Sequence, residues 1–196
     1  MPYEITSSID PEILKKVLWA KLAFSAHAFS IGDFESAMPQ LLIAEQISRQ
    51  LGEKRFLAKT LGHIAVCLKH RGEVIKAYEL HKEEEALCLE IGDNKGLAYA
   101  LLDQARILCE KGEVKTGLDL YLKAEEISRS CDEWGGLFIA LFNYAFYAFY
   151  DTSNLQKAQS KCREALNLTD TRNVNMNDRP NTLNLLAEID EKLGIQ

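Results

Sequence analysis

Residues 61–98 read LGHIAVCLKHRGEVIKAYELHKEEEALCLEIGDNKGLA, and this stretch contains most of one unit of an internal repeat. Apolar and small residues recur at helical spacing up to Leu68, which predicts an amphipathic helix. Gly72 interrupts the pattern, and Glu73 opens a second helix, where an acid suits the positive end of the backbone dipole. That helix ends at Gly92. The stretch therefore predicts two helices joined by a glycine turn.

The same pattern returns when the chain is compared with itself at a shift of 40 residues. A glycine followed by an acid recurs in three units, together with columns of small and apolar residues. Because composition alone does not align so many positions at one shift, we predict an all-α chain of repeated helix pairs. The main columns are Gly32, Gly72 and Gly112; Ala65, Ala105 and Ala145; Leu57, Leu97 and Leu137; and Leu61, Leu101 and Leu141.

The repeat predicts a single domain over residues 1–196, with about four helix pairs and a C-terminal capping helix. The first pair begins at Asp10-Pro11, because an acid caps a helix and proline favours its first position. The fourth pair is degenerate and contains one added residue. The last helix is expected to cover the final stacking surface. The expected segments are repeats at about 11–54, 55–94, 95–134 and 135–168, a polar linker at 169–179 and the capping helix at 180–193.

These units resemble the tetratricopeptide repeat. The period of 40 residues, longer than the usual period of about 34, and the junction IGDNKGLA at 91–98 are similar to the subgroup with extended helices. Glu84 departs from an alanine of the family pattern that Ala44, Ala124 and Ala165 match. The resemblance implies an α-solenoid, a right-handed superhelix whose concave groove is lined by the first helix of each pair. The matching residues are Leu61, Ile64, Ala65, Gly72, Glu73 and Ala77, and then Leu101, Ala105, Gly112, Glu113 and Gly117.

The small residues also have a direct physical reason. Two helices can cross closely only where one side chain has almost no bulk. Ala65 is expected to face Ala77, and Ala105 to face Gly117, at the crossing points of two successive pairs.

The resemblance and the helical spacing together define a partner-binding groove. Along the chain its character changes from apolar through basic and mixed charge to aromatic, which suits an extended or helical peptide with apolar and charged side chains. The family's carboxylate-clamping residues are absent, because Leu22, Ala26, Gly62 and Val66 stand in their places. The residues expected to contact a protein or peptide partner are Trp19, Lys59, His63, Lys69, Tyr99, Asp103, Arg106, Asn143 and Phe146.

Several of these residues have an alternative structural role. His63, Asp103 and Asn143 share one repeat position, and they either bind a ligand backbone or bond neighbouring helices. Arg106 either contacts a partner or pairs with Asp103 or Glu110 at helical spacing. The aromatic run 142–150 is either buried under the following helices or forms a patch for a partner or a second copy of the chain.

Composition limits the function classes. The net charge of −6 disfavours nucleic acid as a partner. No apolar run is long enough for a membrane helix, and no leader of a basic region followed by an apolar run is visible at the N-terminus. The five cysteines show no CxxC spacing, so buried thiols in a cytoplasmic protein are expected.

Catalytic and cofactor motifs are also missing from the sequence. His63 and His70 are seven residues apart, which does not fit the i, i+4 spacing of a helical metal site. No phosphate-binding glycine loop or nucleophile elbow occurs, so neither an enzyme nor a cofactor is expected. The sequence favours a non-catalytic adaptor. The alternative is a sensory or regulatory module of a signalling protein, attached to or acting on a catalytic domain such as a cyclase or kinase. A homo-oligomer built through the aromatic fourth repeat is a further possibility.

Overall fold

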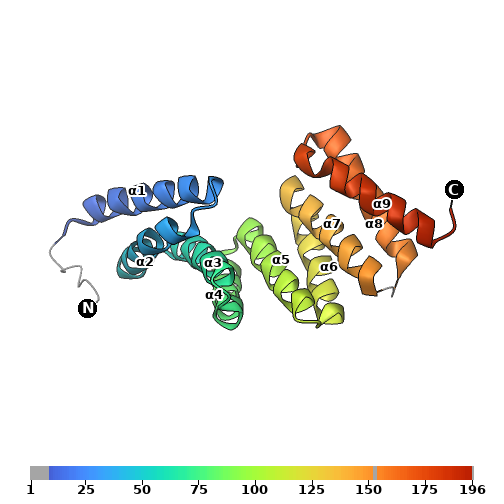
Figure 1. The fold of residues 1–196 in the computed structure, drawn as a ribbon. Helices are drawn as coiled ribbons and strands as arrows, with labels where there is room; N and C mark the ends of the chain where they lie inside the picture. Colours follow the sequence, from blue (N-terminus) through green and yellow to red (C-terminus); the bar gives the residue numbers. More distant parts are fainter. Residues whose placement is uncertain (1–8, 152–153, 196) are drawn as a thin grey trace. The chain divides into compact units, whose positions relative to one another are not determined.

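The computed structural model describes residues 9–151 and 154–195, and over these residues the chain forms α-helices, one short 3-10 helix and no strand (Figure 1). Each helix packs against the next one along the chain within the pairs that the repeat predicts. The predicted fold class, all-α with helices in sequential pairs, is confirmed. The helices are α1 (Pro11–Ser30), α2 (Phe34–Leu51), α3 (Lys54–His70), α4 (Val74–Ile91), α5 (Asn94–Glu110), α6 (Val114–Ser130), α7 (Trp134–Asp151), α8 (Leu155–Arg172), η1 (Met176–Asp178) and α9 (Arg179–Lys192).

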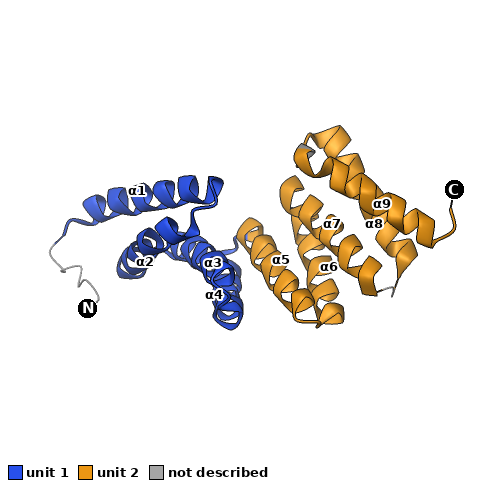
Figure 2. Cartoon of the chain, in the orientation of Figure 1, with its two compact units in different colours: residues 1–93 blue, residues 94–196 orange. Residues whose placement is uncertain are grey.

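The chain divides into two compact units (Figure 2). Unit 1 is Met1–Asp93 and contains α1 to α4; unit 2 is Asn94–Gln196 and contains α5 to α9. In unit 1, α2 packs against both α1 and α3, and α3 packs against α4. In unit 2, consecutive helices pack from α5 to α9, and α5 also contacts α7. The single domain over residues 1–196 stays a prediction.

Residues in the left-handed backbone region mark the repeat boundaries. Gly52 (φ 67°) and Gly92 (φ 66°) cap α2 and α4, and Asp132 (φ 54°) and Asn173 (φ 55°) occupy the corresponding places after α6 and α8. Glycine adopts this conformation without the steric cost that a Cβ brings. The last interval, from 132 to 173, is one residue longer than 40, in agreement with an added residue in the fourth pair.

The C-terminal helices differ in detail from the expected segments. The sequence assigns Thr169 to a polar linker, but α8 continues to Arg172 and buries Thr169. The Thr169 hydroxyl donates to the carbonyl oxygen of Leu166 at 2.7 Å, so the helix itself satisfies this polar group. The buried side of α9 carries Leu185 and Ile189, whereas Leu183 is exposed.

The crossing of α5 and α6 has almost no free space. A Cβ added at Gly117 would lie 2.3 Å from Cys109 Sγ and 2.8 Å from the carbonyl oxygen of Ala105. Both Ala105 and Gly117 are buried. The predicted contact between these two residues is confirmed, and only glycine fits at position 117.

An ion pair recurs at the repeat interval. Each pair joins a base near the start of one first helix to the acid that precedes the next one in sequence. Exposed pairs of this kind contribute at most about 1 kcal/mol each, so their role is mainly in alignment. The pairs are Lys15–Glu53 at 3.2 Å, Arg55–Asp93 at 3.7 Å and Lys95–Glu133 at 2.7 Å.

Candidate protein-binding surface

Four of the predicted contact residues lie in unit 1, where two of them join α1 to α3. The Trp19 side chain is 61% exposed, and its ring meets that of Phe56 edge-on at 5.0 Å. The His63 ring lies 5.0 Å from that of Phe29. Lys59 is exposed on α3, and Lys69 is half-buried near the end of the same helix. The residues are accessible in part, but they do not converge on one point.

Tyr99 of unit 2 has a structural contact that the sequence did not reveal. Its hydroxyl donates to Glu133 Oε1 at 3.1 Å, and Lys95 pairs with the same carboxylate. Burial, with the charge of Glu133, raises the pKa of Tyr99 to about 12. Tyr99 therefore helps to tie the start of α5 to the residue before α7.

The remaining four predicted residues share one surface of unit 2, which α5 and α7 form side by side. On each helix three side chains at spacings of three and four residues fall on one face. The two triplets are also 40 residues apart, so they occupy the same repeat positions. We call this surface the α5–α7 face, and it consists of Asp103, Arg106 and Glu110 on α5 and Asn143, Phe146 and Tyr150 on α7.

Charge dominates the α5 side of the face. Arg106 Nη2 donates to Asp103 Oδ1 at 2.5 Å, so the pairing at helical spacing that the sequence suggested is present. Burial opposes the charged form of Arg106, but the charges of Asp103 and Glu110 outweigh it, and the pKa of Arg106 is raised. The bond to Asp103 uses one of the five N–H groups of a guanidinium. Arg106 can therefore bond a partner while it keeps this ion pair.

Two tyrosines lie behind the charged residues. The ring of Tyr121 on α6 stacks on that of Tyr147 on α7, with centroids 6.1 Å apart. Tyr121 is fully buried, and its hydroxyl has no hydrogen-bond partner among the described residues. Burial raises the pKa of Tyr121, and the charges of Arg106 and Asp103 also act on it. A buried hydroxyl without a partner costs about 1–3 kcal/mol, so this part of unit 2 is not optimised for stability alone.

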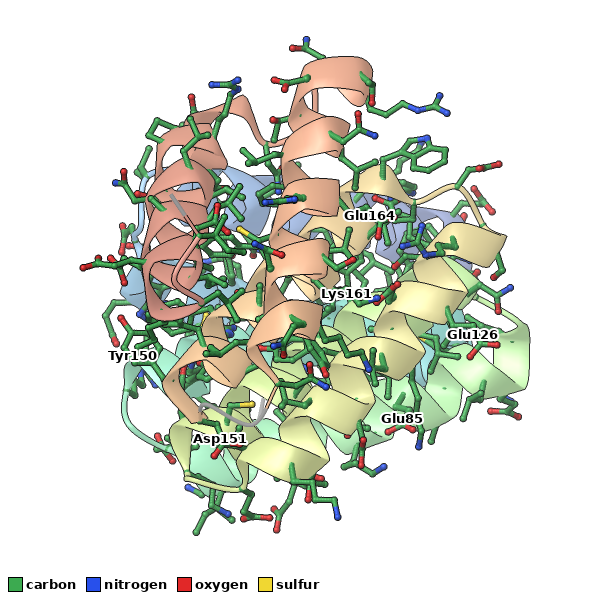
Figure 3. The ribbon with its side chains drawn as sticks, turned by 90° about the vertical axis from the view of Figure 1, so that its right-hand side faces the viewer. Glu85, Glu126, Tyr150, Asp151, Lys161 and Glu164 are labelled. Atoms are coloured by element: carbon green, nitrogen blue, oxygen red, sulfur yellow. The ribbon has the colours of Figure 1, made fainter. Side chains whose placement is uncertain are left out.

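The aromatic run of α7 is buried on one side and exposed on the other. Tyr144 and Phe149 are buried. Phe146 is 36% exposed and Tyr150 is 63% exposed, with their rings 4.8 Å apart. Figure 3 shows Tyr150 at the left edge of the view, at the end of α7. The run is thus buried on one side of the helix, and on the other side its rings are exposed.

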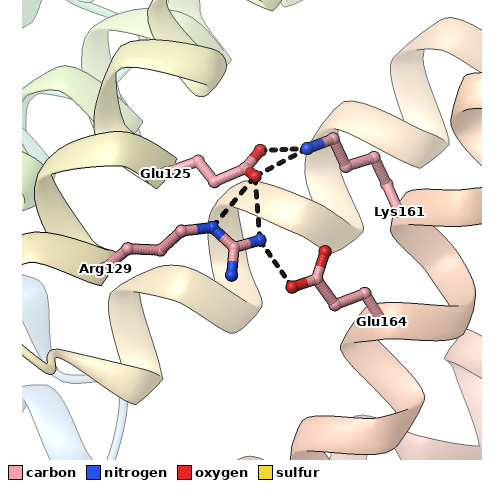
Figure 4. A network of polar contacts seen from close by, with 4 residues as sticks. All are labelled: Glu125, Arg129, Lys161 and Glu164. Atoms are coloured by element: carbon pink, nitrogen blue, oxygen red, sulfur yellow. Dashed lines mark hydrogen bonds and ion pairs between the residues drawn. The ribbon is translucent and has the colours of Figure 1, made fainter.

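A second polar cluster in unit 2 joins α6 to α8 (Figure 4). Lys161 Nζ donates to both carboxylate oxygens of Glu125, at 2.6 and 2.5 Å. Arg129 Nη2 bonds Glu125 at 2.9 Å and Glu164 at 2.5 Å. Because Glu125 is buried and each charge has a partner, the cluster fits a structural role.

Unit 1 contains a related ion pair that the sequence analysis missed. Arg49 pairs with Glu45 at 3.0 Å and with Glu83 at 2.8 Å. Arg49 and Arg129 are two repeats apart, and each follows a glutamate by four residues. That coincidence is the sequence signal that could have found both clusters.

Glu84, the residue that departs from the family pattern, is accommodated by a glycine. A Cβ at Gly62 would lie 2.5 Å from Glu84 Oε1, so the carboxylate occupies space that a side chain would need. Glu84 Oε2 lies 2.8 Å from Nδ1 of buried His81. The other units carry Leu22, Leu102 and Phe142 at the place of Gly62. The larger Glu84 side chain is therefore accommodated because position 62 has no side chain.

Unit 1 also has an apolar depression of about 410 Å³ between α2, α3 and α4. The basic groups at its edge are already engaged within unit 1: Arg71 with Glu35, and Lys76 with Glu73. Few polar groups thus remain there to orient a ligand, which specific pockets require. Its lining residues are Met38, Leu42, Glu45, Ile64, Leu68, Arg71, Lys76, Glu79 and Leu80.

The cysteines are free thiols. Cys67, Cys88, Cys109 and Cys162 are buried, as expected, whereas Cys131 at the end of α6 is half-buried. Over residues 9–151 and 154–195 no group of three potential ligands could hold a metal ion. In the same residues, no helix combines the length and the apolar character that crossing a membrane requires.

Solved structures with this arrangement of helices are known. BtubC (BKLC) from P. vanneervenii superposes with a TM-score of 0.63 at 14% identity, covering 92% of this chain and 84% of that one. A Podosopora anserina protein described as a kinesin light chain with nearly identical TPR-like repeats superposes with a TM-score of 0.66 at 14% identity, covering 94% and 89%. At this identity the likeness concerns the fold. The sequence matches no protein-family model, and no curated protein is significantly similar to it.

Proposed function

We propose that this chain, which has the fold of tetratricopeptide-like repeat proteins, is a non-catalytic adaptor that binds a protein segment on the α5–α7 face. The observation that carries the proposal is the exposure of Phe146 and Tyr150 beside the half-buried Arg106. Aromatic residues and arginine are enriched at protein interfaces, and they supply most of the binding energy where they cluster.

The geometry suits a peptide that lies along the two helices. The α5 triplet offers charged groups, and the α7 triplet offers an amide and two aromatic rings. A bound segment can therefore place apolar or cationic side chains against the rings of α7 and other polar ones against α5. Such alternation of apolar and polar anchors is how helical and extended peptides are recognised.

The buried cysteines and the Arg106–Asp103 pair argue for binding rather than catalysis. The buried cysteines have a raised pKa, so they do not serve as thiolate nucleophiles near neutral pH. Arg106 and Asp103 engage each other instead of activating a nucleophile. The free thiols suit a reducing compartment, and we place the adaptor in the cytoplasm. The acidic charge makes a protein a better partner than nucleic acid.

The test is affinity capture from native lysate with a Phe146→Ala/Tyr150→Ala variant beside the wild type. Ile75→Ala/Leu89→Ala is the matched control, because it truncates two exposed apolar side chains of α4 instead. The proposal predicts that wild type and control retain the same partner and that the double variant loses it. Equal recovery by all three proteins would refute binding at this face.

A further inference from the structure

Resting on the proposed function, we infer that the bound segment is basic, with lysine or arginine side chains that stack on Phe146 and Tyr150. The inference names the chemistry of the partner, which the adaptor role alone leaves open. It depends on the charge around these rings and on how α7 already uses its other aromatic residues.

The charge beside the rings is acidic. Glu110 and Asp151 are the last residues of α5 and α7, while Arg106 pairs with Asp103 and Lys192 lies over the Phe149 ring. The charges of Glu110 and Asp151 both act on Cys109, which places them around one point of the structure. The whole chain carries a net charge of −6, so its long-range field also attracts a basic segment.

Two other aromatic residues of α7 already lie under lysines from within unit 2. Lys192 Nζ lies 3.9 Å from the centre of the Phe149 ring, and Lys157 Nζ lies 5.0 Å from that of Tyr144. Such contacts are favourable because a ring face carries negative charge. The rings of Phe146 and Tyr150 meet other aromatic rings, and no cation is found over either of them among the described residues. A cation from a partner would lie over the rings of Phe146 and Tyr150, as Lys192 lies over Phe149 and Lys157 over Tyr144.

An acidic segment would meet the opposite conditions. Its carboxylates would approach Asp151 and Glu110, and the positive charge of Arg106 is already balanced by the negative charge of Asp103. A second copy of the chain would bring a net charge of −6 to the same acidic face. Charge complementarity therefore favours a basic partner over an acidic segment and over a second copy of the chain.

The experiment is selection of short random peptides, displayed on phage, against the full chain. Three proteins are compared: the wild type, Glu110→Lys/Asp151→Lys, and the control Glu126→Lys/Glu188→Lys, which makes the same charge change at exposed acids of α6 and α9. Lysine-rich and arginine-rich peptides should be enriched by wild type and control. In fluorescence anisotropy the face variant should bind the best of them about tenfold more weakly, and Phe146→Ala should also weaken it.

The outcomes separate this inference from the proposed function. If acidic or neutral peptides are enriched and Arg106→Glu abolishes their binding, the face is a binding site but its partner is not basic. If light scattering shows self-association that the face variant removes, a second copy is the occupant and the inference fails. If no peptide depends on the face, both the inference and the proposed function fail.

Discussion

The substitution Gly117→Ala tests the helix crossing on which the architecture of unit 2 depends. In an ordinary helix this change is favourable, because alanine is the better helix former by about 0.8–1.0 kcal/mol. Here the new methyl group would lie 2.8 Å from the carbonyl oxygen of Ala105 and 2.3 Å from Cys109 Sγ. A backbone oxygen cannot turn aside as a long side chain can, so α5 has to move away from α6.

The size of the effect follows from these opposing contributions. Overpacking a tight interior site costs about 1–3 kcal/mol, and the short distance to backbone places this site at the upper end. After subtraction of the gain in helix propensity, we expect Gly117→Ala to lower the free energy of unfolding by about 1–2 kcal/mol. For a chain of this size each kcal/mol corresponds to about 2–4 °C in the melting temperature.

Denaturant unfolding followed by circular dichroism measures this difference. Gly135→Ala is the matched control, since a Cβ there would be 3.3 Å from the nearest atom, the Tyr99 hydroxyl. The control should change the free energy of unfolding by no more than about 0.5 kcal/mol. If Gly117→Ala is as stable as the wild type or more stable, the close crossing of α5 and α6 is wrong.

Four further predictions concern the cysteines, Asp132 and Lys161. Burial raises the pKa of the four buried cysteines to about 11 or 12 from an ordinary 9.0; a thiol reagent should therefore modify Cys131 first and the others only on unfolding. Because the folded chain retains these thiol protons longer than the unfolded chain does, stability should fall as pH rises above about 9, as denaturation at several pH values will show. Asp132→Gly should raise the unfolding free energy by about 0.5–1 kcal/mol, since its left-handed backbone suits glycine; a lower melting temperature would contradict this. Lys161→Met leaves the buried Glu125 with only Arg129 and should cost about 2–4 kcal/mol in chemical denaturation, and unchanged stability would show that the cluster has no structural role.

Much of the fold is predictable from the sequence, because repeated packing requirements leave repeated residues. The small residues Ala105 and Gly117 mark the crossing of α5 and α6 directly. The glycines at 52 and 92 end helices where the backbone turns left-handed. Asp132 takes the same conformation without being glycine, which is why the third repeat boundary is harder to detect.

Other features depend on pairs of residues that are distant in sequence. The meaning of Glu84 is invisible until Gly62 is known to lie beside it. The length of α8 depends on the burial of Thr169, which polarity alone disfavours. For the binding surface, spacing placed Arg106 and Phe146 on corresponding faces, but only the structure shows which side of the α7 aromatic run is exposed.

Site-specific photo-crosslinking tests most directly whether the α5–α7 face binds a partner. A photoreactive phenylalanine analogue is placed at Phe146 in one protein and at Lys123, exposed on α6, in another, and both are irradiated in living cells. We predict that the analogue at position 146 gives a discrete adduct with another protein, and that the analogue at position 123 does not. Equal adducts from both positions, or none from position 146, would contradict binding at this face.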